Sequence, residues 1–503
     1  MSVLNTIASL YYRGRLNQIH RMSVDPVGMQ RQQLRSLIDA ANDTGFGRDF
    51  SFRKIQSYAD FAEAVPVTDY EHFASWVDRM VRGEANVSWP GVIRWFAKSS
   101  GTTDAKSKFI PVSDQGLQSC HYRGVQDVLA FYLSRHPDSN ILSGKCLTLG
   151  GSKKISSINA NCQTGDLSAI MLGNAPGWSN FLKTPSPNVA LMDKWEEKLV
   201  AITNETIHQN VTYLAGVPSW FMVLLKHIMA HQGVDNIHDV WPNLQLFMHG
   251  GINFEPYRKQ YQAIAPKCIN FMETYNASEG FFAFQTDDND HGLQLMLDYG
   301  VFFEFVPLDE VGLPHPQHAC MIADVVTGVD YAIVISTNCG LWRYMIGDTV
   351  RFTSTNPFKI VISGRTKLYI NAFGEELMIG NAEAAMLKAC SETGAVVREY
   401  TAAPVFMDGN TRGRHQWLVE FEKEPADPDL FARSLDAALQ SVNSDYEAKR
   451  YKDITLDPLS LTVARQGLFF DWMNAQGKLG GQNKVPRLKN DRSIIDPLLA
   501  MNV

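Results

Sequence analysis

The 503-residue sequence predicts an α/β and α+β protein built from two domains. One is a large N-terminal domain of mixed sheets and helices, residues 1–363, and the other is a small α+β domain, residues 364–503. Three observations support this division. The hydrophobic fraction of 45% is sufficient for more than one core. The middle third alternates short apolar strands with helical runs, and from residue 281 the apolar period changes to two.

The N-terminal segment is expected to be helical. Within residues 1–45, Leu34, Leu37 and Ile38 are apolar at helical spacing. A polar loop over residues 97–108 then leads to a further helix, for which the hydroxyl of Ser113 is the expected N-cap.

The middle of the chain is expected to form a largely parallel sheet covered by helices. Short apolar strands are predicted at 147–149, 244–248 and 268–272, and helices near 191–203 and 218–231. Strands that alternate with helices of this length are typical of parallel sheets.

Antiparallel strands are expected next. Residues 281–284, 293–297 and 301–306 are joined by turns rich in Asp and Gly and predict a three-stranded meander. Two more strands are predicted at 331–337 and 347–353. The Ser-Gly-Arg sequence after Ile362 then marks the junction with the C-terminal domain.

Composition and charge exclude several classes of function. Lys plus Arg number 46 and Asp plus Glu 53, so the net charge of −7 gives no global support for binding nucleic acid or an anionic membrane. The seven cysteines form no C-x-x-C pair, which argues against a disulfide framework and a thiolate zinc site. The most apolar run, 211–229, contains Pro218 and Lys226 and is interpreted as a buried helix rather than a membrane span. The N-terminus lacks the continuous apolar core of a signal peptide, so we expect a cytoplasmic protein.

The loop at residues 98–108 has the composition of a phosphate-binding loop. It holds five hydroxyls, one glycine and three lysines, which are the groups that neutralise and bind a polyphosphate. The spacing is not that of a Walker A loop. The alternative is a solvated surface loop.

A second candidate site segment runs from Tyr275 to Gly280. Glu279 beside Ser278 at a strand end is suited to holding Mg²⁺ or a ribose. The segment differs by one residue from a nucleophile elbow, because position 276 is Asn, and the residues that follow are strand-like, so the hydrolase interpretation is rejected.

Asp348 follows Gly347 between two predicted strands. Its carboxylate could accept both hydroxyls of a ribose. The alternative is a solvated hairpin turn.

The fourth segment is a glycine-rich loop at residues 480–487. It carries Lys484 and Arg487, and a basic side chain on such a loop can swing onto an anion in a cleft. A loop lysine is otherwise usually solvated.

Taken in order, these segments resemble the auxin-responsive Gretchen Hagen family of acyl acid–amido synthetases, in a form like its bacterial members. That family belongs to the adenylate-forming superfamily. The similarity runs through nearly the whole chain and is carried by SSGTTDAKSKFIPVS, LAGVPSWFMVLLKHI, WPNLQLFMHGGINFEPY, YNASEGFFAF, WRYMIGDTV, ISGRTKLYI and GQNKVPRL. The resemblance implies a large N-terminal domain, a mobile C-terminal domain and a cleft between them.

The resemblance also implies a function. A carboxylate would attack the α-phosphorus of ATP in the presence of Mg²⁺, and the acyl group would then pass to the amine of an amino acid. Lys484 and Glu279 would be catalytic, with Glu279 holding the metal. The implied phosphate-binding residues are Ser99, Ser100, Gly101, Thr102, Thr103 and Lys108. Gly250, Gly251 and Tyr275 would lie at the adenine, Asp348 at the ribose and Arg365 at the hinge. Ser278 is also implied as a nucleotide-binding residue.

One segment departs from the plant pattern. Plant members carry Asp-Lys-Thr beyond the hinge arginine, whereas residues 369–376 here are Tyr-Ile-Asn-Ala-Phe-Gly-Glu-Glu and contribute no lysine. The missing lysine concerns the hinge and adenylation contacts. The acyl-pocket residues of the plant members cannot be aligned from one sequence, so auxin or jasmonate as substrate does not carry over. The expected partners are a small carboxylic acid and an amino acid, and the oligomeric state stays open. The alternatives are a ligase that delivers the acyl group to coenzyme A or a carrier thiol, and a catalytically silent nucleotide-binding protein.

Overall fold

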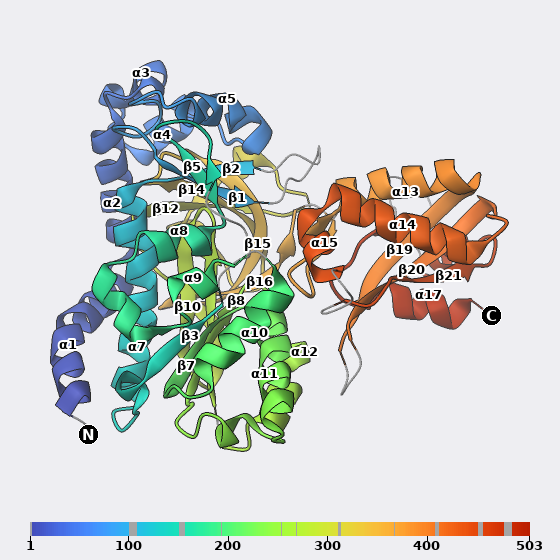
Figure 1. Cartoon of the computed structure of the whole chain (residues 1–503). Helices are drawn as coiled ribbons and strands as arrows, with labels where there is room; N and C mark the ends of the chain where they lie inside the picture. The colour runs from blue at the N-terminus through green and yellow to red at the C-terminus, as the bar shows by residue number, and fades with distance from the viewer. Residues whose placement is uncertain are drawn as a thin grey trace.

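We analyse a computed structural model of the chain. It describes residues 3–99, 108–149, 156–192, 194–252, 254–267, 269–309, 313–366, 368–407, 412–450, 456–476 and 485–502. Figure 1 shows a large body and a smaller one that carries the C-terminus. The expected two-part mixed α/β architecture is therefore confirmed. In the described part of the chain, no helix has the length and apolar character needed to cross a membrane.

The helical character expected within residues 1–45 is confirmed, and two further α-helices follow. These helices are α1 (Val3–Val24), α2 (Pro26–Ala41), α3 (Gly45–Asp49), α4 (Tyr58–Ala64) and α5 (Tyr70–Val81). Helix α2 begins after Asp25, whose carboxylate accepts a hydrogen bond of 2.9 Å from the backbone N–H of Gly28. Its apolar residues Leu34, Leu37 and Ile38 are buried.

A twelve-stranded mixed sheet forms the centre of the large body. The strand order is β13-β12-β14-β15-β16-β11-β10-β9-β8-β7-β3-β6. The parallel half contains β3 (Lys145–Thr148), β6 (Lys183–Thr184), β7 (Val211–Gly216), β8 (Leu246–Gly250) and β9 (Asn270–Ala277). The other half is antiparallel and contains β10 (Gly280–Asp287), β11 (Asp290–Leu295), β12 (Val301–Pro307), β13 (Cys320–Met321), β14 (Asp330–Thr337), β15 (Tyr344–Thr355) and β16 (Phe358–Arg365).

Helices cover both faces of the parallel half. Neighbouring strand residues alternate between two cores, since successive side chains point to opposite faces. Cys146, Tyr213 and Met248 face the core that includes α7 (Arg123–Arg135), and α8 (Leu167–Gly173) lies on the same side. Leu147, Leu214 and Phe247 belong to the second core, shared with α10 (Trp195–Thr206), α11 (Pro218–Gln232) and α12 (Glu255–Ile264). Helix α7 continues α6 (Asp114–Gly116) and a π-helical turn at Leu117–Tyr122.

Four predictions for this region are corrected. Residues 211–216 form strand β7, so the run 211–229 is a strand followed by a helix. The expected three-stranded meander is wrong, because β11 pairs with β10 and β16 whereas β12 pairs with β13 and β14. The helix expected at 191–203 begins later, at Trp195. Gly347 and Asp348 lie inside β15 and do not form a hairpin turn.

A small four-stranded sheet lies beside the main one. It contains β1 (Trp95–Ser99), β2 (Lys108–Val112), β4 (Ser156–Ser157) and β5 (Gln163–Gly165). Strands β1 and β2 are antiparallel neighbours, so the chain leaves and re-enters this sheet around the predicted phosphate loop. Ser113 caps α6, as expected, because its hydroxyl accepts from the N–H of Gly116 at 2.8 Å.

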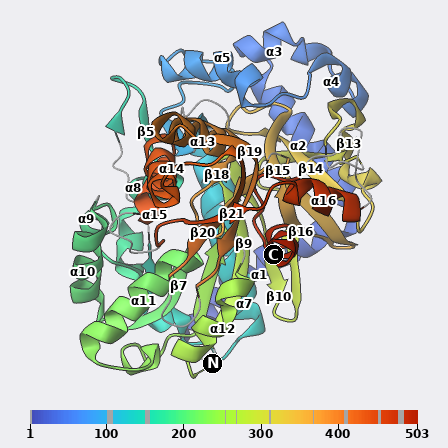
Figure 2. The same cartoon turned by 90° about the vertical axis from the view of Figure 1, so that its right-hand side faces the viewer.

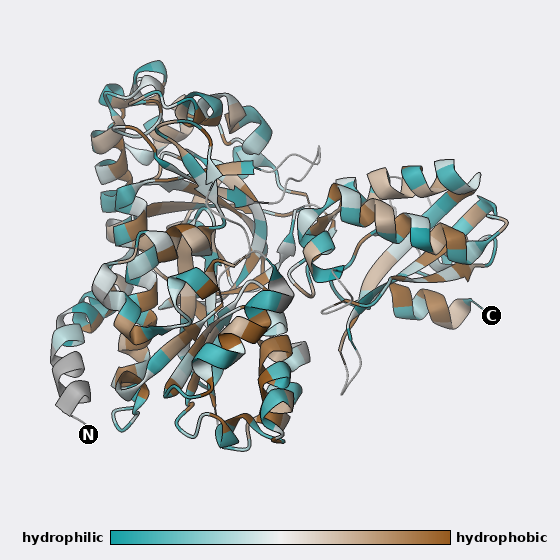
Figure 3. Cartoon of the chain, in the orientation of Figure 1, coloured by the Kyte–Doolittle hydropathy of each residue, from teal (hydrophilic) through white to brown (hydrophobic). Residues whose placement is uncertain are grey.

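The C-terminal body is α+β. Its elements are the hairpin β17 (Tyr369–Ile370) and β18 (Leu377–Met378), then α13 (Ile379–Thr393), β19 (Val396–Val405), β20 (Arg414–Lys423), α14 (Pro428–Val442), α15 (Ser444–Arg450), β21 (Ser460–Ala464), α16 (Leu468–Ala475) and α17 (Ile495–Met501). Figure 2 shows this body in front of the main sheet. Helices in both bodies carry both hydrophilic and hydrophobic residues, as amphipathic helices do (Figure 3). The boundary at residue 364 falls within β16 and stays a prediction.

Candidate active site

A large cavity lies where the two bodies meet. Its volume is about 1600 Å³. Its lining comes from the ends of β7, β8 and β9, from β15 and β16, from helices α7 and α8, and from the C-terminal body through the β17–β18 hairpin and α15. Every described residue that the resemblance assigns to the site, apart from Ser99, lines this one cavity, whereas Arg487 lies outside the lining and pairs with Glu383 and Glu399.

Three of those residues form a connected polar cluster. The hydroxyl of Tyr275 donates a hydrogen bond of 2.7 Å to Oδ2 of Asp348. Nε of Arg365 lies 2.8 Å from Oδ1 of the same carboxylate, across the β15–β16 ladder. The Asp348 side chain is 13% exposed. Each carboxylate oxygen is therefore oriented by a fixed donor and still has lone-pair capacity for one more.

The backbone of β15 directs Asp348 toward the cavity. Gly347 has φ +94°, and the pairing with β14 shifts register between Ala332 and Val334. A bulge of this kind re-aims a side chain and is frequent next to active sites. Glycine at 347 is thus required by the conformation that presents the carboxylate.

Glu279 lies in the two-residue turn that joins β9 and β10, next to Ser278. Burial raises the pKa of Glu279 to about 7, and the nearby ammonium of Lys108 opposes this rise. Lys108 also lies over the ring of Tyr70, 5.5 Å from its centroid. A carboxyl group and an ammonium thus face the same part of the cavity.

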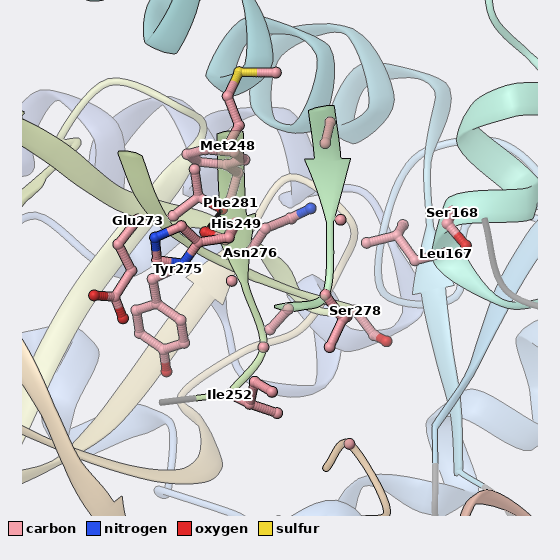
Figure 4. A pocket seen from close by; sticks show the side chains of 18 of the residues that line it. Leu167, Ser168, Met248, His249, Ile252, Glu273, Tyr275, Asn276, Ser278 and Phe281 are labelled. Atoms are coloured by element: carbon pink, nitrogen blue, oxygen red, sulfur yellow. Dashed lines mark hydrogen bonds between the residues drawn. The ribbon is translucent and has the colours of Figure 1, made fainter. Parts of the chain in front are cut away.

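Gly250 ends β8, Gly251 follows it, and both line the cavity. A Cβ at position 250 would lie 2.3 Å from the carbonyl oxygen of Thr274, and Gly251 has φ +85°. Glycine is therefore required at both positions, and the backbone is open to close approach by a planar ligand. Figure 4 shows His249 and Tyr275 beside this strand end.

The remaining predicted residues lie in or beside two loops. Ser99 ends β1, and its backbone pairs with Lys108. Ser100, Gly101, Thr102, Thr103 and Lys484 lie outside the described residues. The segments next to them do reach the cavity: Lys98 and Lys108 flank the first loop, and Leu488 to Asp491 follow the second.

The apolar part of the cavity was not predicted from the sequence. Tyr122, Val125 and Leu129 line it from the π-helical turn and α7, opposite Tyr213 and Met248 of the sheet. The spacing i, i+3, i+7 of the three helical residues is a signal that could have identified this wall.

His249 was also missed. It is buried and stacked on Phe254 at 4.1 Å, and burial together with Arg258 lowers its pKa to about 3, so it is neutral.

The hairpin that departs from the plant pattern connects the two bodies. Ser219 donates to the carbonyl of Phe373 at 3.0 Å, and Tyr257 donates to that of Ala372 at 2.8 Å. Asn371 donates to the carbonyl of Gly251 at 3.2 Å. The hairpin therefore holds the C-terminal body directly against the glycine end of β8.

A lysine from α15 also crosses between the bodies. Nζ of Lys449 lies 3.6 Å from the ring centroid of Trp220 on α11. The two residues are far apart in the sequence, so no local pattern indicated this contact. Both residues line the cavity.

Comparison with known proteins identifies the family. The GH3 family N-terminal domain matches residues 15–269, the central domain 294–365 and the C-terminal domain 380–493. The chain is 24% identical to indole-3-acetic acid-amido synthetase GH3.3 of Arabidopsis thaliana, over 96% of this chain and 93% of that protein.

Two solved structures are similar in fold. The acyl acid amido synthetase AtGH3.15 in complex with 2,4-DB has a TM-score of 0.61 at 17% identity, covering 97% of this chain and 96% of that one. 2-Hydroxyisobutyryl-CoA ligase, in complex with 2-HIB-AMP and CoA, has a TM-score of 0.56 at 11% identity, covering 94% and 91%. Because the N-terminal-domain model alone matches about half of the chain and the other two follow in order, the protein belongs to the GH3 (Gretchen Hagen) family.

Proposed function

We propose that this protein is an ATP-dependent ligase that joins a carboxylic acid to the amine of an amino acid through an acyl-adenylate. The observation that carries the proposal is the Tyr275–Asp348–Arg365 cluster in the wall of a cavity shared by both bodies. The membership in the GH3 family, whose curated relatives include an indole-3-acetic acid-amido synthetase, supports the same chemistry.

The cluster is suited to a nucleoside. A ribose presents two adjacent hydroxyls, and the oriented carboxylate of Asp348 can accept from both. The glycine end of β8 lies on the same cavity, where a planar base can approach the backbone of Gly250 and Gly251. The loop that contains Ser99, Ser100, Gly101, Thr102 and Thr103 would then bind the phosphates, together with Lys108.

The residues at the β9–β10 turn are suited to Mg²⁺. This ion is usually held by one or two carboxylates together with substrate phosphates and waters. Among the described residues no group of three or more His, Cys, Asp or Glu side chains forms a ready-made metal cage. Glu279 would therefore hold the ion jointly with ATP, and the ion would supply neutralisation of phosphate charge.

The reaction follows in two steps. A carboxylate oxygen of the acid attacks the α-phosphorus, and the bond to the β-phosphate oxygen breaks to release pyrophosphate. The amine then attacks the acyl carbon, loses its proton and displaces AMP. Both steps need alignment and charge neutralisation more than a strong base. Lys484 would approach the α-phosphate, since the segment that follows it reaches the cavity.

Delivery to a thiol is the second candidate function, because the fold also matches a coenzyme A ligase. The net charge of −7 gives little support for binding the phosphates of coenzyme A.

We also propose a cytoplasmic location, because the six described cysteines are all unpaired.

Pyrophosphate exchange tests the proposal. The protein is incubated with ATP, Mg²⁺, labelled pyrophosphate and a panel of carboxylic acids, and incorporation of label into ATP is measured. The active acid is then incubated with amino acids or with coenzyme A, and the products are identified by mass. Exchange followed by an amide product supports the proposal. A thioester product would show that the acceptor is a thiol rather than an amine. If label enters ATP with none of the acids, adenylation is contradicted.

A further inference from the structure

The cavity continues well beyond the nucleotide end. On the sheet face toward α7, Cys146, Tyr213 and Leu246 lie side by side in register, and Lys183 pairs with Cys146 on the edge strand β6. Leu246 is four residues before Gly250 on β8, so this level lies about 13 Å along the strand from the glycine end. Lys183, Cys146 and Tyr213 all line the cavity.

Between these two ends the lining is mainly apolar, with the hydroxyl of Thr148 on β3 as a polar group. Val125 and Leu129 of α7 and Met171 of α8 face Met248 of β8. An apolar wall of this kind suits a hydrocarbon chain, which gains from leaving water and requires no hydrogen bonds.

The far end is polar. The Lys183 ammonium is half-buried, and burial lowers its pKa, whereas the nearby Cys146 opposes this shift. In the part of the chain that the structure describes, Lys183 forms no ion pair with a carboxylate. The aromatic hydroxyl groups of Tyr12 and Tyr213 lie at the same end of the cavity. Even partial burial of an ammonium costs free energy, and an accompanying anion offsets that cost.

A ligand that satisfies both regions has an apolar middle and an anionic far end. We infer that the acid substrate is a dicarboxylic acid, with one carboxylate at the nucleotide and the second held by Lys183. This inference rests on the proposed function and names the substrate class of the same site. Lys183 is then a specificity-determining residue, and it takes no part in the chemistry at the reacting carboxylate.

Matched pairs of acids test the inference. Straight-chain monocarboxylic and α,ω-dicarboxylic acids of equal carbon number are compared by pyrophosphate exchange in the wild type and in Lys183→Met. At the carbon number whose chain spans the cavity from the nucleotide end to Lys183, the wild type should show a higher kcat/KM for the dicarboxylic acid than for the monocarboxylic acid. The variant should lose at least tenfold in kcat/KM for the diacid while its rate with the monoacid stays equal or rises, because a charge-assisted hydrogen bond is lost only with the diacid.

Two further variants serve as controls. Lys183→Arg keeps the cation and should keep the preference. Lys226→Met removes a lysine from α11, on the other face of the sheet and outside the cavity lining, and should leave the ratio unchanged. Thermal unfolding of all variants identifies any folding defect.

Failure of this inference and failure of the proposed function give different results. Exchange with monoacids that is equal to or better than exchange with diacids, unchanged by Lys183→Met, would overturn the inference alone. If no acid supports exchange, the proposed function fails. Calorimetric titration of the diacids into the wild type and Lys183→Met, without ATP, then still decides whether Lys183 binds the second carboxylate.

Discussion

At the scale of single residues, Asp348 is the most informative position. Its carboxylate is held by the hydroxyl of Tyr275 and the guanidinium of Arg365. Hydrogen bonds from a ribose to this charged acceptor should contribute about 1.5–3 kcal/mol each. Asp348→Ala should therefore raise the KM for ATP by at least about tenfold and change the KM for the acid much less. Initial-rate kinetics with each substrate varied checks this, and equal damage to both constants would indicate a folding defect.

Tyr275→Phe tests how much the orientation of the Asp348 carboxylate matters while its charge is kept. The variant keeps the ring against Phe282 and removes only the hydroxyl that donates to Asp348. We expect a smaller rise in the KM for ATP than with Asp348→Ala, because Arg365 still orients the carboxylate. A larger effect than that of Asp348→Ala would show that the hydroxyl itself contacts the nucleotide.

Arg343, in the same sequence motif as Asp348, is structural. Its guanidinium pairs with the fully buried Glu304 at 2.7 Å and donates to the carbonyl of Val65 at 2.7 Å. Removing one partner of a buried pair leaves an uncompensated charge. Arg343→Met should lower the free energy of unfolding by about 3–5 kcal/mol in urea titrations. A loss below 1 kcal/mol would contradict this structural role.

At the scale of elements, the contact of α15 with α11 makes stability depend on pH. Burial lowers the pKa of Lys449, and the carboxylates of Asp445, Glu375 and Glu376 oppose this only in part. The unfolded chain then binds more protons than the folded one below the ordinary lysine pKa, so this group makes stability rise with pH from neutrality toward about 10.4.

Lys449→Met should remove that contribution. The melting temperature of the variant minus that of the wild type should fall steadily between pH 7 and 10, as differential scanning fluorimetry can measure. Lys423→Met, at an exposed lysine of β20, should show a constant difference. A constant difference for Lys449→Met as well would mean that its ammonium carries no burial cost.

The sequence predicted elements well where local signals act. Ser113 was expected to cap a helix, and it does, because the cap is a contact between residues three apart. Residues 211–216 were misread as helix, since a continuous apolar run does not distinguish a buried strand from a buried helix. The pairing of β11 with β16 joins segments far apart in the chain. Hydrophobic periodicity within each segment does not specify which strands pair, so the sequence did not predict this neighbour. The motifs singled out Tyr275, Glu279 and Asp348, which all line the cavity, whereas no motif indicated the contact of Lys449 with Trp220.

At the scale of the whole molecule, the arrangement of the two bodies determines which residues reach the cavity. Hydrogen bonds that involve Ser219, Tyr257 and Asn371 connect the β17–β18 hairpin to the large body, and one core includes residues from both bodies. We propose that Lys484 acts in only one half-reaction and that rotation of the C-terminal body controls its approach to the α-phosphate.

Lys484→Ala tests this proposal. Adenylate formation should fall by about two to three orders of magnitude, while a chemically supplied acyl-adenylate is still converted to amide at a substantial rate. Single-turnover measurements of each half-reaction give the two rates. A proportional loss in both would show that the lysine is always in place or acts elsewhere.

The acyl-adenylate itself can be traced by its oxygen. The active acid, labelled with ¹⁸O in its reacting carboxylate, is incubated with the protein, ATP, Mg²⁺ and the amine, and the products are analysed by mass spectrometry. If the carboxylate attacks the α-phosphorus and the amine then displaces AMP, one labelled oxygen must appear in the phosphate of AMP. Label in inorganic phosphate, with ADP as the nucleotide product, would contradict an adenylate and place the attack at the γ-phosphorus.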